Sequence, residues 1–219
     1  MRRVEKGAEP ESLLRYRKQK EPAPSYDGFR EKQALRERLA DDQGGLCCYC
    51  MTRIRPDEEG MKVEHFRSQH RHPTLQLLWT NLLGACRDLP GARRSDQTCD
   101  SRKGDAELSI DPLTLRSDQF VYEEDGRVLA VDTSLQAELD AVLGLNVTAL
   151  MRARREAWFA LRTVVARKLG ARSTWSGAAL QREVDALRAS RPLPEFLGLF
   201  EFWLERLQRK RRTSPSSPK

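Results

Sequence analysis

All five cysteines of the chain lie between residues 47 and 99, and four of them have the spacing of metal ligands. Cys47 and Cys50 form a Cys-x-x-Cys pair, and two thiolates at this spacing can bind one Zn²⁺ ion from a tight turn. A tetrahedral site needs two more ligands, for which Cys86 and Cys99 are the remaining candidates. A Cys₄ zinc site would join the two ends of this polar segment. The alternative is that some of these cysteines are inert and buried, which is our interpretation of Cys48.

Polar side chains suited to hydrolysis lie between and after these cysteines. Glu64 and His65 form an acid–histidine pair, Asn81 precedes the third cysteine ligand, and Asp100 follows the last cysteine directly. This order, with Lys103 three residues after Asp100, resembles the layout of HNH nucleases, which have a ββα-metal fold braced by zinc knuckles. The match covers about a quarter of the chain.

The resemblance implies a role for each of these residues. Hydrolysis of a phosphodiester needs an activated water molecule and positive charge beside the phosphate oxygens. A neutral imidazole can accept the proton of that water at cellular pH, and this role falls to His65. Glu64 and Asp100 would hold a catalytic Mg²⁺ or Mn²⁺ ion, while Asn81 would hydrogen-bond to the backbone of the loop that orients His65. Four basic residues are expected to contact nucleic acid, namely Arg93, Arg94, Arg102 and Lys103.

Two features depart from the usual HNH pattern. The last motif position is often His or Asn, and here it is Asp100, which is a sound ligand for hard cations such as Mg²⁺. The second knuckle is widened by the segment 89–97, which contains Arg93 and Arg94. This basic loop could touch the DNA backbone, or it could be a solvated loop. The two histidines outside the motif are expected to lie at the surface.

The resemblance is more specific for one group within the HNH nucleases. It rests on the segments 43–50, 79–86 and 98–105, and it continues through 110–113 and 143–146. These segments resemble the HNH nucleases of the Septu anti-phage defence family, the PtuB-like proteins that are also found beside certain retrons. The resemblance implies an antiviral nuclease effector whose partner is an ABC/SMC-type ATPase (PtuA-like).

The chain of 219 residues is basic, with 39 Lys and Arg against 32 Asp and Glu and a formal net charge of +7. A basic total favours nucleic acid or another polyanion as partner, although a soluble Arg-rich surface explains the charge equally well. No apolar run approaches the roughly 18 residues needed to span a bilayer, which excludes a transmembrane enzyme. The basic N-terminus is followed by no apolar segment typical of a signal peptide, so we expect a cytoplasmic protein with reduced thiols.

The apolar pattern predicts the elements that position these residues. Proline and charge in residues 1–25 indicate an extended arm, and Gly44-Gly45 would end the helix that follows it. Asp125-Gly126 is a hairpin signal, and helical spacing of apolar residues indicates that the remainder is helical. The expected elements are a helix over 26–42, a β-like run over 61–63, a helix near 75–85, strands over 120–122 and 127–131, and helices near 135–143, 148–169, 176–189 and from 194.

We therefore predict an α+β protein in which a zinc-braced ββα-metal (HNH) nuclease core is embedded in a mainly α-helical chain. The predicted regions are an N-terminal arm and helix (1–45), the nuclease core (46–112), a β-hairpin connection (113–132), a helical C-terminal region (133–212) and a disordered tail (213–219). The predicted function is metal-dependent hydrolysis of phosphodiester bonds in DNA, and no residue excludes RNA. The alternatives are a zinc-stabilised nucleic-acid-binding module and a helical adaptor, both without catalysis.

Overall fold

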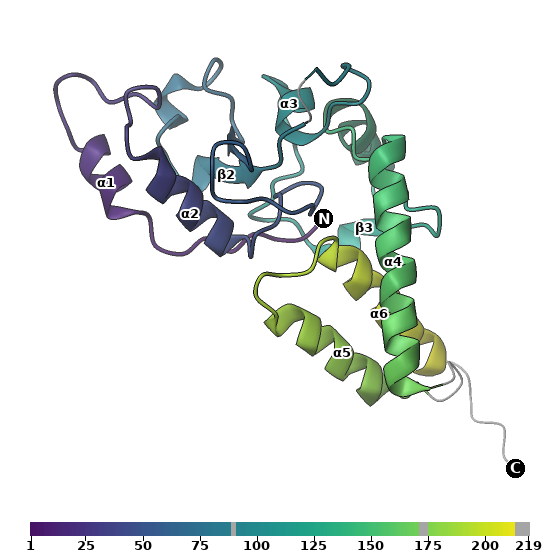
Figure 1. The fold of residues 1–219 in the computed structure, drawn as a ribbon. Helices are drawn as coiled ribbons and strands as arrows, with labels where there is room; N and C mark the ends of the chain where they lie inside the picture. Colours follow the sequence, from purple (N-terminus) through teal and green to yellow (C-terminus); the bar gives the residue numbers. More distant parts are fainter. Residues whose placement is uncertain (89–90, 171–174, 213–219) are drawn as a thin grey trace, which may run out of the picture.

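The chain has a mixed architecture in which two small antiparallel sheets lie among helices (Figure 1). The computed structural model describes residues 1–88, 91–170 and 175–212, and the side chains up to residue 209. The predicted α+β class is confirmed at this coarse level. The predicted disordered tail, residues 213–219, lies outside the described residues, and the division of the chain into regions stays a prediction.

The N-terminal segment contains a helix where the proline pattern predicts an extended arm. Helix α1 (Glu11–Arg17) begins directly after Pro10, which occupies the N-cap position. Leu13 of this helix is completely buried, so an apolar contact holds the segment in place. The prediction of an extended arm is therefore wrong for α1, because the burial of one helical turn outweighs the prolines that flank it.

Helix α2 (Lys32–Asp42) is shorter at its start than the predicted helix over 26–42. Leu35 and Leu39 lie on its buried side and are fully covered. Gly44 and Gly45 follow the helix with φ of +62° and +75°, a left-handed conformation that glycine adopts without steric cost. The helix therefore ends where the glycine pair predicts.

The first sheet carries the predicted catalytic histidine at one end. Its elements and those that adjoin it are β1 (Lys62–His65), η1 (Pro73–Leu75), η2 (Trp79–Asn81), β2 (Leu82–Ala85) and α3 (Cys99–Lys103). The two strands are antiparallel, with His65 opposite Leu82. The predicted helix near 75–85 is wrong, because two 3₁₀ turns lead into a strand whose four residues are all buried. A short apolar run buried on both faces cannot be told from a helix by its periodicity.

The second sheet is the predicted hairpin. Strands β3 (Phe120–Tyr122) and β4 (Val128–Ala130) pair antiparallel around Gly126, which has φ of +92°. The helix expected near 135–143 is present, but as a 3₁₀ turn that leads into a π-helix and not as a regular α-helix. The short turns that flank the hairpin are η3 (Ser117–Gln119), the 3₁₀ turn η4 (Thr133–Leu135) and the π-helical η5 (Glu138–Val142).

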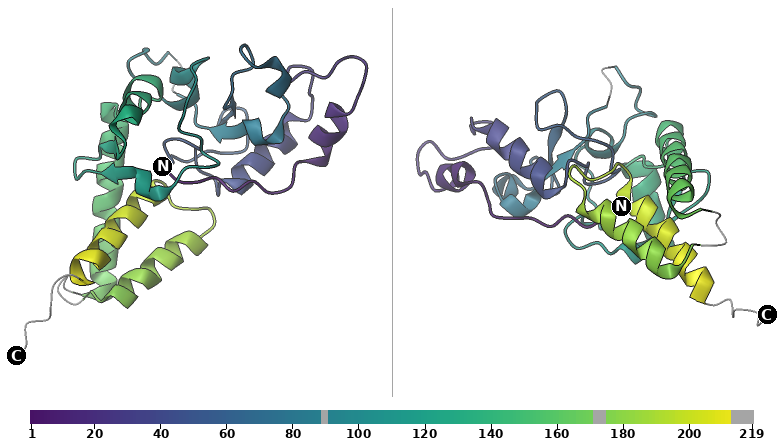
Figure 2. Two further views of the ribbon diagram at one scale, coloured as in Figure 1. Left: turned by 180° about the vertical axis from the view of Figure 1, so that it is seen from behind. Right: turned by 60° about the horizontal axis from the view of Figure 1, so that its bottom comes forward.

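Three helices gather at the end of the molecule opposite α1 and α2 (Figure 2). They are α4 (Thr148–Leu169), α5 (Gly177–Ala189) and α6 (Leu197–Arg212). Ser176 caps α5, since its hydroxyl accepts a hydrogen bond from the amide of Ala179 at 3.1 Å. The last helix begins after the predicted Pro194, because Phe196 has a left-handed φ of +57°. The three predicted C-terminal helices are otherwise present.

One large core joins the two sheets, α2 and the start of α6. A second, smaller cluster lies between the three C-terminal helices and consists of Val165, Trp175, Leu180, Val184 and Leu204. Helix α2 packs against β2, which places the N-terminal helices beside the first sheet. Among the described helices, none combines the length and apolar character that a membrane crossing requires.

Candidate zinc site and active site

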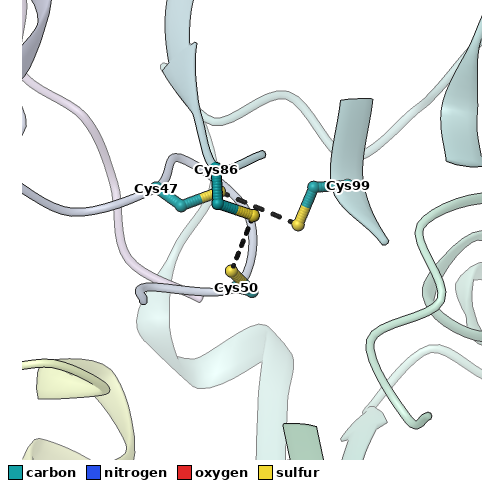
Figure 3. A group of neighbouring side chains, drawn as sticks. All are labelled: Cys47, Cys50, Cys86 and Cys99. Carbon is teal, nitrogen blue, oxygen red and sulfur yellow. Dashed lines mark hydrogen bonds between the residues drawn. The ribbon is translucent and has the colours of Figure 1, made fainter. Parts of the chain in front are cut away.

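Four cysteine thiols form one buried cluster (Figure 3). The Sγ atoms of Cys47, Cys50, Cys86 and Cys99 all lie within 4.8 Å of one another. The Sγ atoms of Cys47 and Cys99 are 3.7 Å apart, and those of Cys50 and Cys86 are 3.6 Å apart. Four sulfur atoms bound tetrahedrally at about 2.3 Å from one zinc ion would be separated by about 3.8 Å. The donor set and its spacing therefore fit a structural Zn²⁺ site.

The four cysteines come from three separate pieces of the chain. Cys47 and Cys50 lie on the turn after α2, Cys86 follows β2 directly, and Cys99 is the first residue of α3. The turn is closed by a hydrogen bond from the amide of Met51 to the carbonyl of Cys47 at 3.1 Å. A metal ion bound here would hold the first sheet, the turn and α3 together, where short elements alone bury little surface.

The pKa values of Cys47, Cys86 and Cys99 depend on the neighbouring thiols, whereas that of the fifth cysteine, Cys48, is governed mainly by burial. Burial would raise the pKa of Cys47, but hydrogen bonds from the neighbouring thiols lower it well below its usual value. Interaction with Cys47 raises the pKa of Cys86, and burial followed by the same interaction raises that of Cys99. Cys48 is 3% exposed, lies outside the cluster and has a pKa raised by burial. This placement agrees with its interpretation as an inert buried residue.

Glu64 lies in a buried network and not at an open metal site. Its Oε1 atom accepts a hydrogen bond from the Tyr49 hydroxyl at 2.7 Å and lies 2.9 Å from the Nζ atom of Lys103. The side chains of Glu64 and Lys103 are each 1% exposed. Burial, and then the nearby Asp100 carboxyl group, raise the pKa of Glu64 in spite of the Lys103 charge. Glu64 could bind a cation only if Lys103 moved away.

Asp100 is the more accessible of the two predicted carboxylate ligands. Its side chain is 24% exposed, and its Oδ2 atom lies 2.9 Å from the Nζ atom of Lys62. Burial would raise the pKa of Asp100, but its hydrogen bond with Glu64 and the charge of Lys62 lower it. An ionised, partly exposed carboxylate has the donor chemistry that a hard divalent cation requires. Asp100 therefore fits the catalytic metal better than Glu64 does.

His65 is held through one nitrogen of its ring. Its Nε2 atom lies 3.0 Å from the backbone carbonyl oxygen of Gln76, which can only accept a hydrogen bond. The neutral ring therefore carries its proton on Nε2, and Nδ1 keeps a free lone pair. Burial lowers the pKa of His65 to about 4, although the Gln76 carbonyl and the charge of Asp100 act in the opposite direction. The imidazole is thus neutral at cellular pH and can accept a proton at Nδ1.

Asn81 joins the two ends of the segment that follows His65. Its Oδ1 atom accepts from the amide of Arg67 at 2.7 Å, and its Nδ2 atom donates to the carbonyls of Arg67 and Leu75 at 3.0 and 3.1 Å. The amide of Phe66 also donates to the backbone carbonyl of Asn81 at 2.9 Å. These bonds fix the loop on which the His65 ring rests, since Gln76 follows Leu75 directly.

Comparison with known proteins shows what the chain is similar to. No known family profile matches the chain. A protein described as a candidate HNH endonuclease of retron Vc95 from Vibrio cholerae serotype O1 biovar El Tor is 30% identical over 136 residues. The Septu protein PtuB from Bacillus thuringiensis is 27% identical over 82 residues. The chain is thus similar, over part of its length, to proteins of Septu and retron defence, one of which is described as an HNH endonuclease.

The similarity to these two proteins covers part of each protein. The match to the retron protein spans 57% of this chain and 63% of the relative. The match to PtuB spans 37% of this chain and 28% of the relative. The chain therefore matches less than two thirds of the length of either relative.

The structure places the four predicted nucleic-acid contacts in different settings. Lys103 is buried and also donates to the backbone carbonyl of His65 at 3.0 Å. The Arg102 guanidinium donates to the carbonyls of Ala141 and Ser95 at 3.0 and 2.9 Å. Arg93 and Arg94 are exposed on the loop before α3. Of the two histidines outside the motif, His70 is exposed as expected, whereas His72 is partly buried and its Nε2 atom lies 2.9 Å from Glu107 Oε1.

Four residues around the site are not apparent from the HNH motif. Tyr49 and Lys62 contact the two carboxylates, while Gln76 and Tyr26 contact His65. Tyr49 could have been found, because it lies between the two cysteines of the Cys-x-x-Cys pair. Tyr26 and Gln76 lie away from His65 in the sequence and meet it only in the folded chain. There the amide of Tyr26 also donates to Gln76 Oε1 at 2.9 Å.

Proposed function

We propose that the protein is a metal-dependent HNH endonuclease that hydrolyses phosphodiester bonds in DNA as a nuclease of anti-phage defence. The observation that carries this proposal is the hydrogen bond between His65 Nε2 and the Gln76 carbonyl, which leaves Nδ1 as a proton acceptor. The order β1, β2, α3 supports a ββα-metal core, with His65 at the end of β1 and Asp100 on α3. The similarity to HNH endonucleases supports the same reaction.

In this proposal His65 is the general base. Its neutral imidazole takes a proton from the attacking water at Nδ1, while Nε2 stays fixed on the Gln76 carbonyl. Asn81 is a positioning residue, because its three hydrogen bonds fix the segment between His65 and Gln76. A flexible loop would let the ring turn away from the water that it must deprotonate.

Asp100 would hold the catalytic Mg²⁺ or Mn²⁺ ion. When bound, such an ion stabilises the negative charge that develops on the phosphate. Glu64 was predicted as a second ligand, and its contacts with Tyr49 and Lys103 favour a positioning role in the described arrangement. The Cys47, Cys50, Cys86 and Cys99 cluster would hold a structural Zn²⁺ ion that takes no part in the reaction.

We further propose that the protein acts with a PtuA-like ABC/SMC-type ATPase, as its similarity to a Septu protein suggests. Helix α4 offers a surface for a protein partner, since Phe159 and Val164 are 50% and 46% exposed on it. Apolar side chains of this size are exposed at few described positions of the chain. An exposed aromatic residue beside arginines is typical of the centre of a protein interface.

Cleavage of defined substrates tests the proposed function. The purified protein, alone and with a PtuA-like ATPase from the same genome, is incubated with plasmid DNA, phage DNA and tRNA in Mg²⁺, Mn²⁺ or EDTA. Cutting of DNA with Mg²⁺ or Mn²⁺, lost in EDTA while zinc remains bound, would support the proposal. Binding of DNA without nicking under every condition would instead support a non-catalytic nucleic-acid-binding module.

A further inference from the structure

Two basic residues of α2, Lys32 and Arg36, lie near the predicted catalytic histidine although neither belongs to the HNH motif. The Tyr26 ring packs edge-on against the ring of His65, with centroids 4.6 Å apart. The Nζ atom of Lys32 lies 4.7 Å from the centroid of the same Tyr26 ring. Tyr26 therefore contacts both the ammonium group of Lys32 and the imidazole of His65.

Arg36 extends this positive charge by one helical turn. Residues four apart lie on the same face of a helix, so Arg36 and Lys32 point from α2 in similar directions. The positive charge of Arg36 also acts on the Tyr26 hydroxyl, whose pKa burial raises to about 12 and Arg36 partly lowers. The Nε atom of Arg36 is buried and has no hydrogen-bond partner among the described residues.

Lys32 and Arg36 differ from Arg38, a third basic residue of α2, in their ion pairing. Neither Lys32 nor Arg36 takes part in a salt bridge with any residue that the structure describes. By contrast, Arg38 on the same helix lies 2.8 Å from the carboxylate of Asp42. Asp27 and Asp100 both add negative charge near Tyr26 and His65. Lys32 and Arg36 are therefore the basic groups of α2 whose charges no described carboxylate pairs with.

The basic residues of the HNH motif that could bind phosphate already form hydrogen bonds or ion pairs with other groups of the protein. Lys103 is 3% exposed and bonds to Glu64 and to the His65 carbonyl, while Arg102 bonds to the carbonyls of Ala141 and Ser95. A nuclease that acts on a charged backbone needs basic side chains that can exchange their hydration water for contacts with phosphate oxygens. Near His65, the described structure places such cations on α2.

We propose that Lys32 and Arg36 bind the phosphodiester backbone of the substrate next to His65, with Tyr26 between them and the imidazole. This inference rests on the proposed function in taking His65 as the catalytic residue. Lysine supplies a point charge, and arginine supplies directed donors that match the oxygens of a phosphate. The ligand is the backbone of a nucleic acid, and duplex DNA is the form to which we assign it.

Binding measurements can test this assignment without any cleavage. The Lys32→Gln/Arg36→Gln double variant is compared with wild type by fluorescence anisotropy on a labelled DNA duplex, at several KCl concentrations and without divalent cations. A duplex RNA of the same sequence is the second probe. The control is Arg155→Gln/Arg167→Gln, which removes the same charge from the exposed face of α4. Circular dichroism and zinc content show whether each variant is folded.

Loss of two phosphate contacts should weaken DNA binding by one to two orders of magnitude near 0.1 M salt and reduce the slope of log K against log salt by about 2. The Arg36→Lys variant keeps the charge and should retain most of the affinity. A larger loss on DNA than on RNA would support the assignment to DNA. Equal losses in the α2 and α4 variants, an unchanged slope, loss confined to RNA, or no DNA binding by wild type would overturn it.

The same samples separate this inference from the proposed function. If wild type cuts DNA but the α2 variant binds with an unchanged slope, the phosphate site is wrong and the nuclease function stands. If wild type binds DNA through Lys32 and Arg36 but never cuts, the nuclease function is wrong and the phosphate site stands. The His65→Ala variant should lose cleavage and keep the salt slope of wild type, because His65 contributes no positive charge at cellular pH.

Discussion

The Nζ atom of Lys103 lies 2.9 Å from the Oε1 atom of Glu64, and both side chains are 1% exposed. Lys103 ends the helix that begins with the zinc-site residue Cys99. Tyr49, which reaches the same carboxylate, lies between two other cysteines of the cluster. The Cys47–Cys50 turn, through Tyr49, and helix α3, through Lys103, therefore both contact Glu64, which precedes His65. Through these contacts the cysteine cluster positions the predicted catalytic strand.

Removing Lys103 should destabilise the protein strongly. The Lys103→Met variant leaves Glu64 buried without its counter-charge, and loss of one partner of a buried ion pair costs about 3–5 kcal/mol. Lys62→Met is the matched control, since the Lys62–Asp100 pair is partly exposed and its loss should cost about 1 kcal/mol or less. Urea unfolding of the three proteins measures both effects, and equal costs would contradict a special role for the buried pair.

A second change should relieve part of this cost. In Lys103→Met/Glu64→Gln no buried charge is left without a partner, so the double variant should be more stable than Lys103→Met alone. Cleavage should remain low in both, because the hydrogen bond from Lys103 to the His65 carbonyl is lost. If both stability and cleavage recover in the double variant, Lys103 stabilises the fold and has no separate role in cleavage.

Zinc should be bound at one ion per chain and should be lost when a cluster cysteine is changed. Cys47→Ser and Cys99→Ser remove one of the four thiolates, so metal analysis should show release of zinc and circular dichroism a loss of structure. Cys48→Ser is the control, because Cys48 is equally buried but lies outside the cluster. A well-folded wild-type protein without zinc would disprove the site.

Lys6 should make stability depend on pH in a defined window. Its Nζ atom lies 3.2 Å from the centroid of the Trp79 ring and donates to the Leu82 carbonyl at 2.6 Å. Burial lowers the pKa of Lys6 to about 7, although Asp42 and Cys48 act to raise it. Above this pH the folded protein has released a proton that the unfolded chain still holds up to about pH 10.4.

The sign of the effect follows from proton binding. Because the unfolded state binds more protons between about pH 7 and 10, the contribution of Lys6 to the free energy of unfolding rises with pH across that window. Below about pH 7 both states are protonated and the contribution is constant. Urea unfolding of wild type and Lys6→Met at pH 6, 7, 8 and 9 measures the difference. A difference that falls or stays level from pH 7 to 9, relative to the exposed Lys20→Met control, would count against the burial of a lysine with this pKa.

Asn81 should matter for catalysis through its donor group. Asn81→Asp keeps an acceptor for the Arg67 amide but removes the donors to the Arg67 and Leu75 carbonyls, at about 1–3 kcal/mol for each buried group left without a partner. We expect a lower cleavage rate at saturating DNA with a nearly unchanged affinity for DNA. If the variant instead loses affinity and keeps its rate, Asn81 contacts the substrate and does not position the loop.

The sequence allowed much of the site to be predicted, because metal-ligand spacing and helix signals are local. The four cysteines meet as their spacing predicts, Gly44 and Gly45 end α2, and the pair Asp125-Gly126 makes a hairpin. The failures concern relationships between distant segments. Burial of β2 on both faces makes a strand of an apolar run that suggests a helix, and only the fold reveals that Lys103 turns inward and Tyr26 meets His65.

The most direct test of the nuclease assignment is a single-turnover cleavage assay of His65→Ala on plasmid DNA with Mg²⁺. If His65 is the general base, the rate should fall by about 10²–10⁴-fold relative to wild type, with zinc content, circular dichroism and DNA affinity unchanged. A folded His65→Ala protein that cuts at the rate of wild type would contradict the assignment.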